Sequence, residues 1–145
     1  MKIINKAVDL INSCGEVTLA SVNENGFPRI CVMAKIKSEG IKKVYVATGM
    51  SSNKTTHFQA NPKASICAWK GGNSITLIGT IKVTQDHAIL EQMWLDWFIE
   101  HFPGGISDPN YCILVFTAEE ATLWIDNEFV TVRDDNLSKT ESPGL

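Results

Sequence analysis

The sequence predicts a mainly β fold, an antiparallel β-barrel with a few flanking helices. Its strand-like segments follow one another as hairpins instead of alternating with helices, which disfavours a parallel, doubly wound sheet. The 145 residues suit one domain with an ordinary core, and 44% hydrophobic with 20% charged residues is typical of a globular protein. We expect this domain to span residues 1–132. The remaining segment, 133–145, is polar and lacks aromatic residues, so we expect a flexible tail.

The first elements are a helix and a β-hairpin. Apolar residues recur with helical spacing over residues 3–11, and Gly15 suits the C-cap of that helix. Residues 16–22 alternate like a strand, and "NENG" (23–26) contains the Asn-Gly pair typical of a tight hairpin turn. The returning strand is predicted over residues 28–36.

A third strand is expected over residues 42–48, and a short helix over 51–60. This helix should end at Asn61, because a residue before proline disfavours the α conformation. A second hairpin follows, with a strand over 64–70, a Gly-Gly-Asn turn over 71–73 and a strand over 74–83.

A second helix is predicted over residues 87–102, with Thr84 or Asp86 as its N-cap and Pro103-Gly104-Gly105 after its end. Two last strands are expected over residues 111–117 and 121–126. Trp69 and Trp124 fit the cores of their strands. The helix also contains four large aromatic residues, which is more than one narrow core stripe buries. They indicate either core packing or a subunit interface. These residues are Trp94, Trp97, Phe98 and Phe102.

Charge and cysteine content limit the partners and the compartment. The net charge is −3, and no basic patch stands out, so we expect no nucleic-acid partner. The N-terminus has no signal-peptide pattern, and no apolar run approaches membrane length, so we expect a cytoplasmic protein without a membrane partner. The four cysteines are widely spaced and form no C-x-x-C pair. We expect free thiols and no metal site.

The strongest candidate for a binding site is the segment "YVATGMSSNKTTHFQANP" (45–62), where a strand passes into a helix. Hydroxyls, an amide and the ammonium of Lys54 gather at the expected helix N-terminus, which is a natural place for a phosphate. It is not a P-loop, because Asn53 stands where the glycine before the lysine would be. Helix capping by Ser51 alone is the alternative explanation of this composition. The residues themselves leave both possibilities open.

No nucleophile or acid–base catalyst stands out. The three histidines, at positions 57, 87 and 101, are isolated in sequence and indicate surface or packing roles. The acidic residues of the second helix indicate a solvated face; they are Asp86, Glu91, Asp96 and Glu100.

Three segments, taken in order, resemble the pyridoxamine 5′-phosphate oxidase-like superfamily in its short general-stress-protein branch. They are "NGFPRICVM" (25–33), "TGMSSNK" (48–54) with the later Asn61-Pro62, and "MWLDWF" (93–98) followed by "HFPGGISDPNY" (101–111). The resemblance covers about residues 3–130. It implies an antiparallel, Greek-key split β-barrel that forms a homodimer and binds one FMN per subunit in the groove between subunits.

The resemblance also implies a set of cofactor-binding residues. The flavin phosphate would lie against the turn between the third strand and the helix, at Thr48, Ser51, Ser52, Asn53 and Lys54. The second strand would offer backbone groups to the edge of the ring, from Arg29, Ile30, Cys31, Val32 and Met33. Ser74 would face the ring. Trp94 and the FPGG turn would come from the partner subunit.

Two departures from the family pattern matter. Many relatives have an arginine where this chain has Cys31; Arg29 lies two residues away on the same strand face and is positioned to replace it. The chain also lacks the C-terminal segment with which the long oxidases hold pyridoxal phosphate. We therefore expect an FMN-dependent oxidoreductase with an unidentified small-molecule substrate, and not a vitamin B6 oxidase. The alternatives are a non-catalytic flavin-binding or flavin-sensing protein, or a split barrel that binds haem, through His57 or His87, or a deazaflavin.

Overall fold

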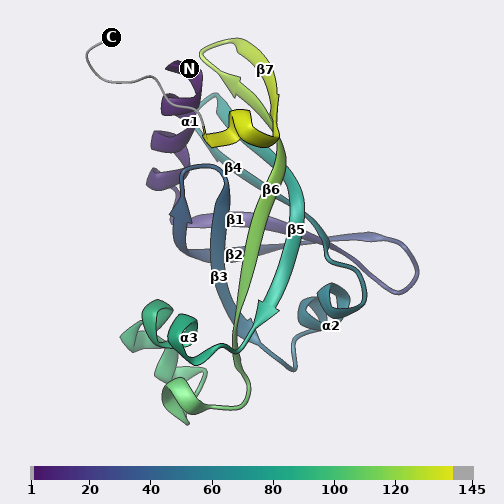
Figure 1. The fold of residues 1–145 in the computed structure, drawn as a ribbon, viewed down its shortest axis with the longest axis vertical. Coiled ribbons are helices and arrows are strands. Elements are labelled where there is room, and N and C mark those ends of the chain that lie inside the picture. The colour runs from purple at the N-terminus through teal and green to yellow at the C-terminus, as the bar shows by residue number, and fades with distance from the viewer. Residues whose placement is uncertain (1, 139–145) are drawn as a thin grey trace.

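The computed structural model describes residues 2–138, which form seven strands, three α-helices and three short 3₁₀ helices (Figure 1). The first half contains α1 (Lys2–Ser13), β1 (Glu16–Val22), β2 (Pro28–Glu39), β3 (Lys43–Gly49), α2 (Asn53–Ala60) and β4 (Lys63–Lys70). The second half contains β5 (Asn73–Thr84), α3 (His87–Met93), η1 (Asp96–Glu100), η2 (Gly105–Ser107), β6 (Tyr111–Ile125), β7 (Glu128–Arg133) and η3 (Asp134–Ser138).

The strands form a closed antiparallel barrel with one additional strand. Their order is β3-β2-β1-β4-β5-β6-β7, and β3 also pairs with β6, which closes β1 to β6 into a ring. Every pairing is antiparallel. Figure 1 shows α1 near one end of the barrel and α2 and α3 near the other. The predicted fold class is therefore confirmed.

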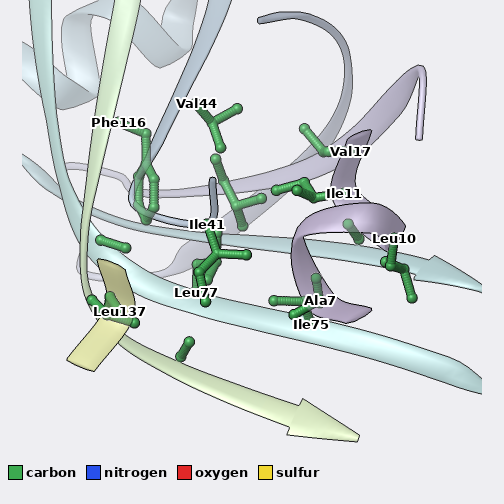
Figure 2. Close-up of a cluster of buried hydrophobic side chains, with 14 of the residues drawn as sticks. Ala7, Leu10, Ile11, Val17, Ile41, Val44, Ile75, Leu77, Phe116 and Leu137 are labelled. Carbon is green, nitrogen blue, oxygen red and sulfur yellow. The ribbon is translucent and has the colours of Figure 1, made fainter. Parts of the chain in front are cut away.

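The barrel interior and the inner face of α1 form the main core. Ile4, Ala7 and Ile11 of α1 are fully buried, and Figure 2 shows Ala7 and Ile11 close to barrel residues such as Val17 and Ile75. A second buried cluster lies beneath α3 and η1; it consists of Tyr45, Leu90, Met93, Phe98, Phe102, Tyr111 and Ile113. The first cluster fills the barrel, and the second packs α3 and η1 against β3 and β6.

Most of the predicted hairpins form as expected. The first turn contains Gly26 at φ 82°, and the Asn23 side chain accepts hydrogen bonds from the backbone N–H groups of Asn25 and Phe27. Strand β2 runs three residues beyond its predicted end. The first helix ends at Ser13, close to the predicted C-cap glycine, Gly15, which is not among the glycines with a positive φ and so forms no left-handed cap.

The predicted helix over 87–102 is interrupted. Asp86 caps α3 by accepting from Ile89 N–H, and the chain is then extended at Trp94 and Leu95 before η1 begins. The buried positions explain the break, because the step from Met93 to Phe98 is five residues and does not fit the helical period of 3.6. The extended residues restore the phase and turn Phe98 inward.

Sequence reasoning also misjudged the C-terminal strands. The two strands predicted over 111–117 and 121–126 are one strand, β6, with an irregularity opposite Ile78 and Gly79. Strand β7 was not predicted. It follows a two-residue turn at Asp126 and Asn127, whose φ angles are 52° and 66°. An Asp-Asn pair of this kind is a hairpin signal, since both residues tolerate a positive φ.

Ordered structure continues beyond residue 132, where we expected the domain to end. Arg133 ends β7, and η3 places Leu137 in the core, where its side chain is 1% exposed (Figure 2). The rest of the tail, 139–145, lies outside the described residues. Trp69 and Trp124 are 55% and 40% exposed, so their predicted place in the strand cores is wrong; both lie on the outer face of the barrel.

Candidate functional site

In the turn between β3 and α2, no serine hydroxyl caps the helix. Ser52, and not Ser51, is the N-cap of α2, and its side chain makes no capping hydrogen bond. Helix capping by Ser51 therefore does not explain the composition of this turn. Within residues 2–138, the backbone N–H groups of Asn53 and Lys54 have no protein acceptor. Free N–H groups at the start of a helix are the feature that binds anions.

The Lys54 side chain folds back over the turn between β3 and α2. Its ammonium donates to Ser52 Oγ at 2.8 Å and to Thr48 Oγ1 at 3.3 Å. Thr55 ties the helix to the end of β3 by donating from Oγ1 to the Gly49 carbonyl at 2.7 Å. No carboxylate of the described residues forms an ion pair with Lys54 or Arg29. Two unpaired cations are thus available to an anion.

A cavity of about 140 Å³ brings these groups together, and we call it the anion seat. It is lined by Ser21, Arg29, Cys31, Ser52, Asn53 and Lys54. Ser21 of β1 and Arg29 of β2 are opposite each other in the strand register, so their side chains leave the same face. The seat contains two cationic side chains and no carboxylate. Arg29 therefore reaches the predicted phosphate turn, and Cys31 lies beside it.

An apolar groove of about 430 Å³ adjoins the anion seat and shares Ser52 with it. Its volume is within the range of small-molecule pockets. It is lined by Val32, Met33, Ala34, Ala47, Thr48, Gly49, Ser51, Ser52, Trp97, Phe98, His101, Phe102 and Asn110.

The groove lies where the barrel is split. Strand β2 pairs with β3 only from Lys35 onward, whereas its residues 28–34 pair with β1 alone. Beyond Val46, β3 likewise pairs only with β6. Both strands therefore present unpaired backbone edges toward the groove, and such groups bind hydrogen-bonding ligands readily.

The loop before β6 holds the phosphate turn in place. Asn110 accepts from Met50 N–H through its carbonyl at 2.7 Å and from Ser51 N–H through Oδ1 at 2.9 Å. Asp108 in turn accepts from the N–H groups of Asn110 and Gly104, both at 2.9 Å. Sequence reasoning missed Asn110. The only local signal is the Asp-Pro-Asn sequence, which is typical of a turn and does not indicate what the turn contacts.

The other predicted site residues are distributed as follows. Ile30 is 69% exposed and lines neither the anion seat nor the groove. Ser74 is opposite Trp124 near the start of β5, away from both. Trp94 packs edge-on against Phe98 and Tyr111 of the same chain, with ring centres 5.4 and 5.3 Å from its own. Trp97, and not Trp94, lines the groove.

The histidines have three different environments. His57 is buried, and its Nδ1 is 2.9 Å from Ser21 Oγ. His87 is exposed on α3, 3.8 Å from Glu91. His101, which no sequence pattern singled out as a ligand, lines the groove. Of the three, His101 is the one placed to contact a ligand there.

The titration of buried groups gives no sign of an activated nucleophile. Burial raises the pKa of the Cys112 thiol to about 11, with smaller opposing effects from Thr55 and Lys54. Burial also raises the pKa of Tyr111 to about 12. Residues 2–138 contain no group of three or more side chains that could hold a metal ion. No helix in that range is both long and apolar enough to cross a membrane.

Comparisons with known proteins agree with this architecture. Residues 2–135 match the family described as pyridoxamine 5′-phosphate oxidase like. A Clostridium acetobutylicum protein related to general stress protein 26 of Bacillus subtilis, of the pyridoxinephosphate oxidase family, is 29% identical, with a TM-score of 0.82 over 94% of this chain and 97% of that one. General stress protein 26 of Bacillus anthracis is 22% identical, with a TM-score of 0.76 over 91% and 100% of the two chains.

A more distant structure of this fold is named for the ligand that it binds. A heme binding protein of Mycobacterium smegmatis is 14% identical, with a TM-score of 0.74 over 90% of this chain and 57% of that one. None of the curated proteins matches the chain.

Proposed function

The chain belongs to the pyridoxamine 5′-phosphate oxidase-like family, and from that premise we propose that it is a homodimeric, cytoplasmic FMN-binding flavoprotein and an FMN-dependent oxidoreductase with a small-molecule substrate. The observation that carries the proposal is the anion seat, in which Arg29 and Lys54 face one small cavity without a carboxylate. Two unpaired cations together with free helix N–H groups favour a doubly charged phosphate.

The residues of the anion seat and of the groove fit the phosphate and the ring of FMN, respectively. The seat suits the phosphate, and the adjoining groove suits a planar ring because Trp97, Phe98 and Met33 supply apolar walls. The unpaired backbone edge of β2 offers hydrogen bonds to a polar ring edge. Arg29 provides the charge that relatives with an arginine at position 31 supply from that position.

The bound flavin would supply the electron transfer. Lys54, Arg29 and the helix N–H groups would hold the phosphate, while Asn110 keeps the turn in register. The apolar groove would exclude water from the ring and orient the substrate against it. We assign no acid–base catalyst for this proposed reaction.

The outer face of the barrel supports the homodimer. Val32 of β2 and Ile78 of β5 are 61% and 47% exposed, and Ile30 lies beside Val32. The strand register connects Ile30 to Ile78 through Ala20 and Ser65, so these four side chains form one row across β2, β1, β4 and β5. An exposed face with large apolar residues and small ones between them suits a second copy of the chain.

A second exposed row continues this face. Trp69, Ser74, Trp124 and Phe129 are successive cross-strand partners from β4 to β7. The rings of Trp124 and Phe129 are 5.8 Å apart, and both residues are exposed. Ser74 therefore lies within the aromatic part of the outer face. If it contacts a flavin ring, that ring would belong to the partner's groove.

The test is to identify the ligand of the purified protein. A yellow preparation whose ligand has the mass of FMN is the expected result. Titration of the apoprotein should show FMN binding more tightly than riboflavin, which lacks the phosphate. Equal affinities would mean that the anion seat does not bind the flavin. Consumption of NAD(P)H by the yellow protein would distinguish an enzyme from a flavin-binding or flavin-sensing protein.

Haem is the second candidate, because the M. smegmatis protein of this fold is named as a heme binding protein and His101 lines the groove. His57 and His87, the histidines considered from sequence, do not line it. A red preparation whose Soret band is lost in His101→Ala would favour haem over FMN. A deazaflavin would be recognised by its mass in the same ligand analysis.

A further inference from the structure

A buried pair of polar side chains lies directly behind the anion seat. Ser21 Oγ, on β1, is 2.9 Å from His57 Nδ1, on α2, and the two residues are 4% and 9% exposed. Ser21 lines the anion seat next to Arg29 and Lys54. On the other side, His57 Nε2 lies 3.7 Å from the carboxylate of Glu24 in the loop between β1 and β2.

We propose that Ser21 is a direct hydrogen-bond donor to the phosphate in the anion seat, and that His57 is the positioning residue that directs the Ser21 proton toward it. This inference rests on the proposed function, because it takes the phosphate to be that of FMN. It adds two residues that the phosphate turn does not contain, and it makes affinity depend on the protonation of His57.

The Ser21 hydroxyl has a single proton, and the direction of that proton decides whether Ser21 can donate to an anion. If Ser21 donates that proton to His57 Nδ1, only oxygen lone pairs face the seat, and these repel an anion. If Nδ1 carries a hydrogen and donates to Ser21, the hydroxyl proton is free to point into the seat. Donation from Ser21 to an anion in the seat therefore requires a hydrogen on Nδ1.

The surrounding charges connect this requirement to protonation. Glu24 makes no hydrogen bond to the ring, but its negative charge, 3.7 Å from Nε2, favours a hydrogen on that nitrogen. In a neutral His57 ring, Nδ1 is then an acceptor and takes the Ser21 proton in a hydrogen bond. Only the imidazolium carries both hydrogens. Arg29, which shares an outer cavity with His57, and Lys54, which lines the anion seat together with Ser21, oppose that charge. A bound dianion offsets both cations, so phosphate binding and His57 protonation favour each other.

A hydrolytic Ser-His-Glu triad is a poorer explanation of the same residues. In such a triad, Nε2 of the histidine faces the serine and Nδ1 faces the acid, whereas here the nitrogens are reversed. The Glu24 side chain is also 79% exposed and is too distant from the ring for a hydrogen bond.

The test compares wild type with Ser21→Ala and His57→Asn, and uses His87→Asn as a matched control on an exposed histidine. FMN and riboflavin are titrated by flavin fluorescence between about pH 5.5 and 8, where histidine changes charge. Ser21→Ala should lower FMN affinity about tenfold and leave riboflavin affinity unchanged. His57→Asn keeps an amide N–H near the position of Nδ1, so it should bind FMN without the pH dependence of wild type.

Sulfate provides an independent readout, because it remains a dianion where phosphate titrates. It should raise the melting temperature of wild type more at low pH than at high pH, and should do so less in Ser21→Ala. Unchanged FMN affinity in Ser21→Ala, or the same pH profile in His57→Asn as in wild type, would overturn the inference while the proposed function stands. If wild type bound no FMN but sulfate stabilised it through Ser21, the proposed function would fail and the Ser21–His57 assignment would stand.

Discussion

Arg29 and Lys54 line the same cavity but belong to different elements, β2 and α2. Lys54 is next to Ser52 and Asn53 along the chain, so the composition of one turn indicated an anion site there, with helix capping as the alternative. Arg29 reaches the site because β2 pairs with β1 and α2 packs at the end of the barrel, beside Ser21. Without the family resemblance, nothing in the sequence around Arg29 indicates that approach.

Lys54→Ala should weaken FMN binding about ten- to a hundredfold, since a charge-assisted hydrogen bond contributes roughly 1.5–3 kcal/mol. Arg29→Ala should have a similar effect if Arg29 replaces the arginine absent at position 31. Lys82→Ala, on an exposed strand position outside the seat, is the matched control. Fluorescence titration of the three variants gives the affinities. An unchanged affinity in either seat variant would remove that side chain from the site.

The alkaline stability of the fold should depend on Tyr111. Burial raises its pKa to about 12 from an ordinary value near 10, and its hydroxyl donates to the Leu90 carbonyl at 2.9 Å. The unfolded chain therefore loses this proton at a lower pH than the folded one. The stabilisation is complete below about pH 10 and is lost as the pH rises toward 12. Cys112, with a pKa raised to about 11, adds a loss that begins near its ordinary value of 9.

Urea unfolding at several alkaline pH values tests this dependence. Tyr111→Phe should be less stable than wild type at neutral pH by about 1–3 kcal/mol, because the Leu90 carbonyl loses its donor. Above pH 10, its unfolding free energy should fall less steeply than that of wild type. Parallel curves for the two proteins above pH 10 would show that Tyr111 does not titrate as a buried group.

At the scale of elements, the local signals decided which features could be predicted. The hairpins around Gly26 and Gly71 follow from glycine-containing turns flanked by alternating residues, and both form. The break at Trp94 does not follow from any local breaker; it results from the aromatic rings that pack around Tyr111. Strand β7 was missed because the Asp126-Asn127 pair was not read as a turn.

Gly79→Ala should destabilise the barrel strongly. A Cβ atom at this position would overlap the Thr117 carbonyl oxygen and would lie 2.9 Å from Ala118 Cα, where the β5–β6 register is irregular. Because both neighbours are backbone atoms, they cannot move as a side chain could. We expect a loss of at least about 2 kcal/mol in the free energy of unfolding.

Gly15→Ala is the control for this substitution. Gly15 has no atom within 4 Å of the added Cβ, and it is not among the glycines with a positive φ. Urea unfolding should therefore place Gly15→Ala close to wild type. If Gly79→Ala were equally stable, the close approach of β5 and β6 at this point would be wrong.

At the scale of the whole molecule, the barrel opens where the proposed ligand would bind, and it is apolar where a second copy would pack. No residue of β2 is buried within one chain, although β2 lies between β1 and β3 in the strand order. Composition and periodicity could predict a barrel, but the closure of β3 on β6 and the resulting split depend on long-range pairing. Those contacts have no local signature in the sequence.

The proposed flavin site and the proposed dimer interface should depend on each other. Ile78 lies on the outer face, and it lines neither the anion seat nor the groove. Ile78→Asp would place a charge in the proposed interface, where like charges from the two copies would oppose each other. If the partner's outer face completes the flavin site, this variant should become monomeric and lose FMN affinity, although every residue of the seat is intact.

Sedimentation of the apoproteins with and without FMN measures both effects. In wild type, added FMN should shift the protein toward dimer and raise its melting temperature, because a ligand that binds only the assembled site stabilises it by mass action. Gln59→Glu, on an exposed face of α2, adds a negative charge elsewhere and should behave as wild type. A monomeric Ile78→Asp protein that bound FMN with unchanged affinity would show that one chain forms the complete site. The partner's outer face would then have no part in holding the flavin.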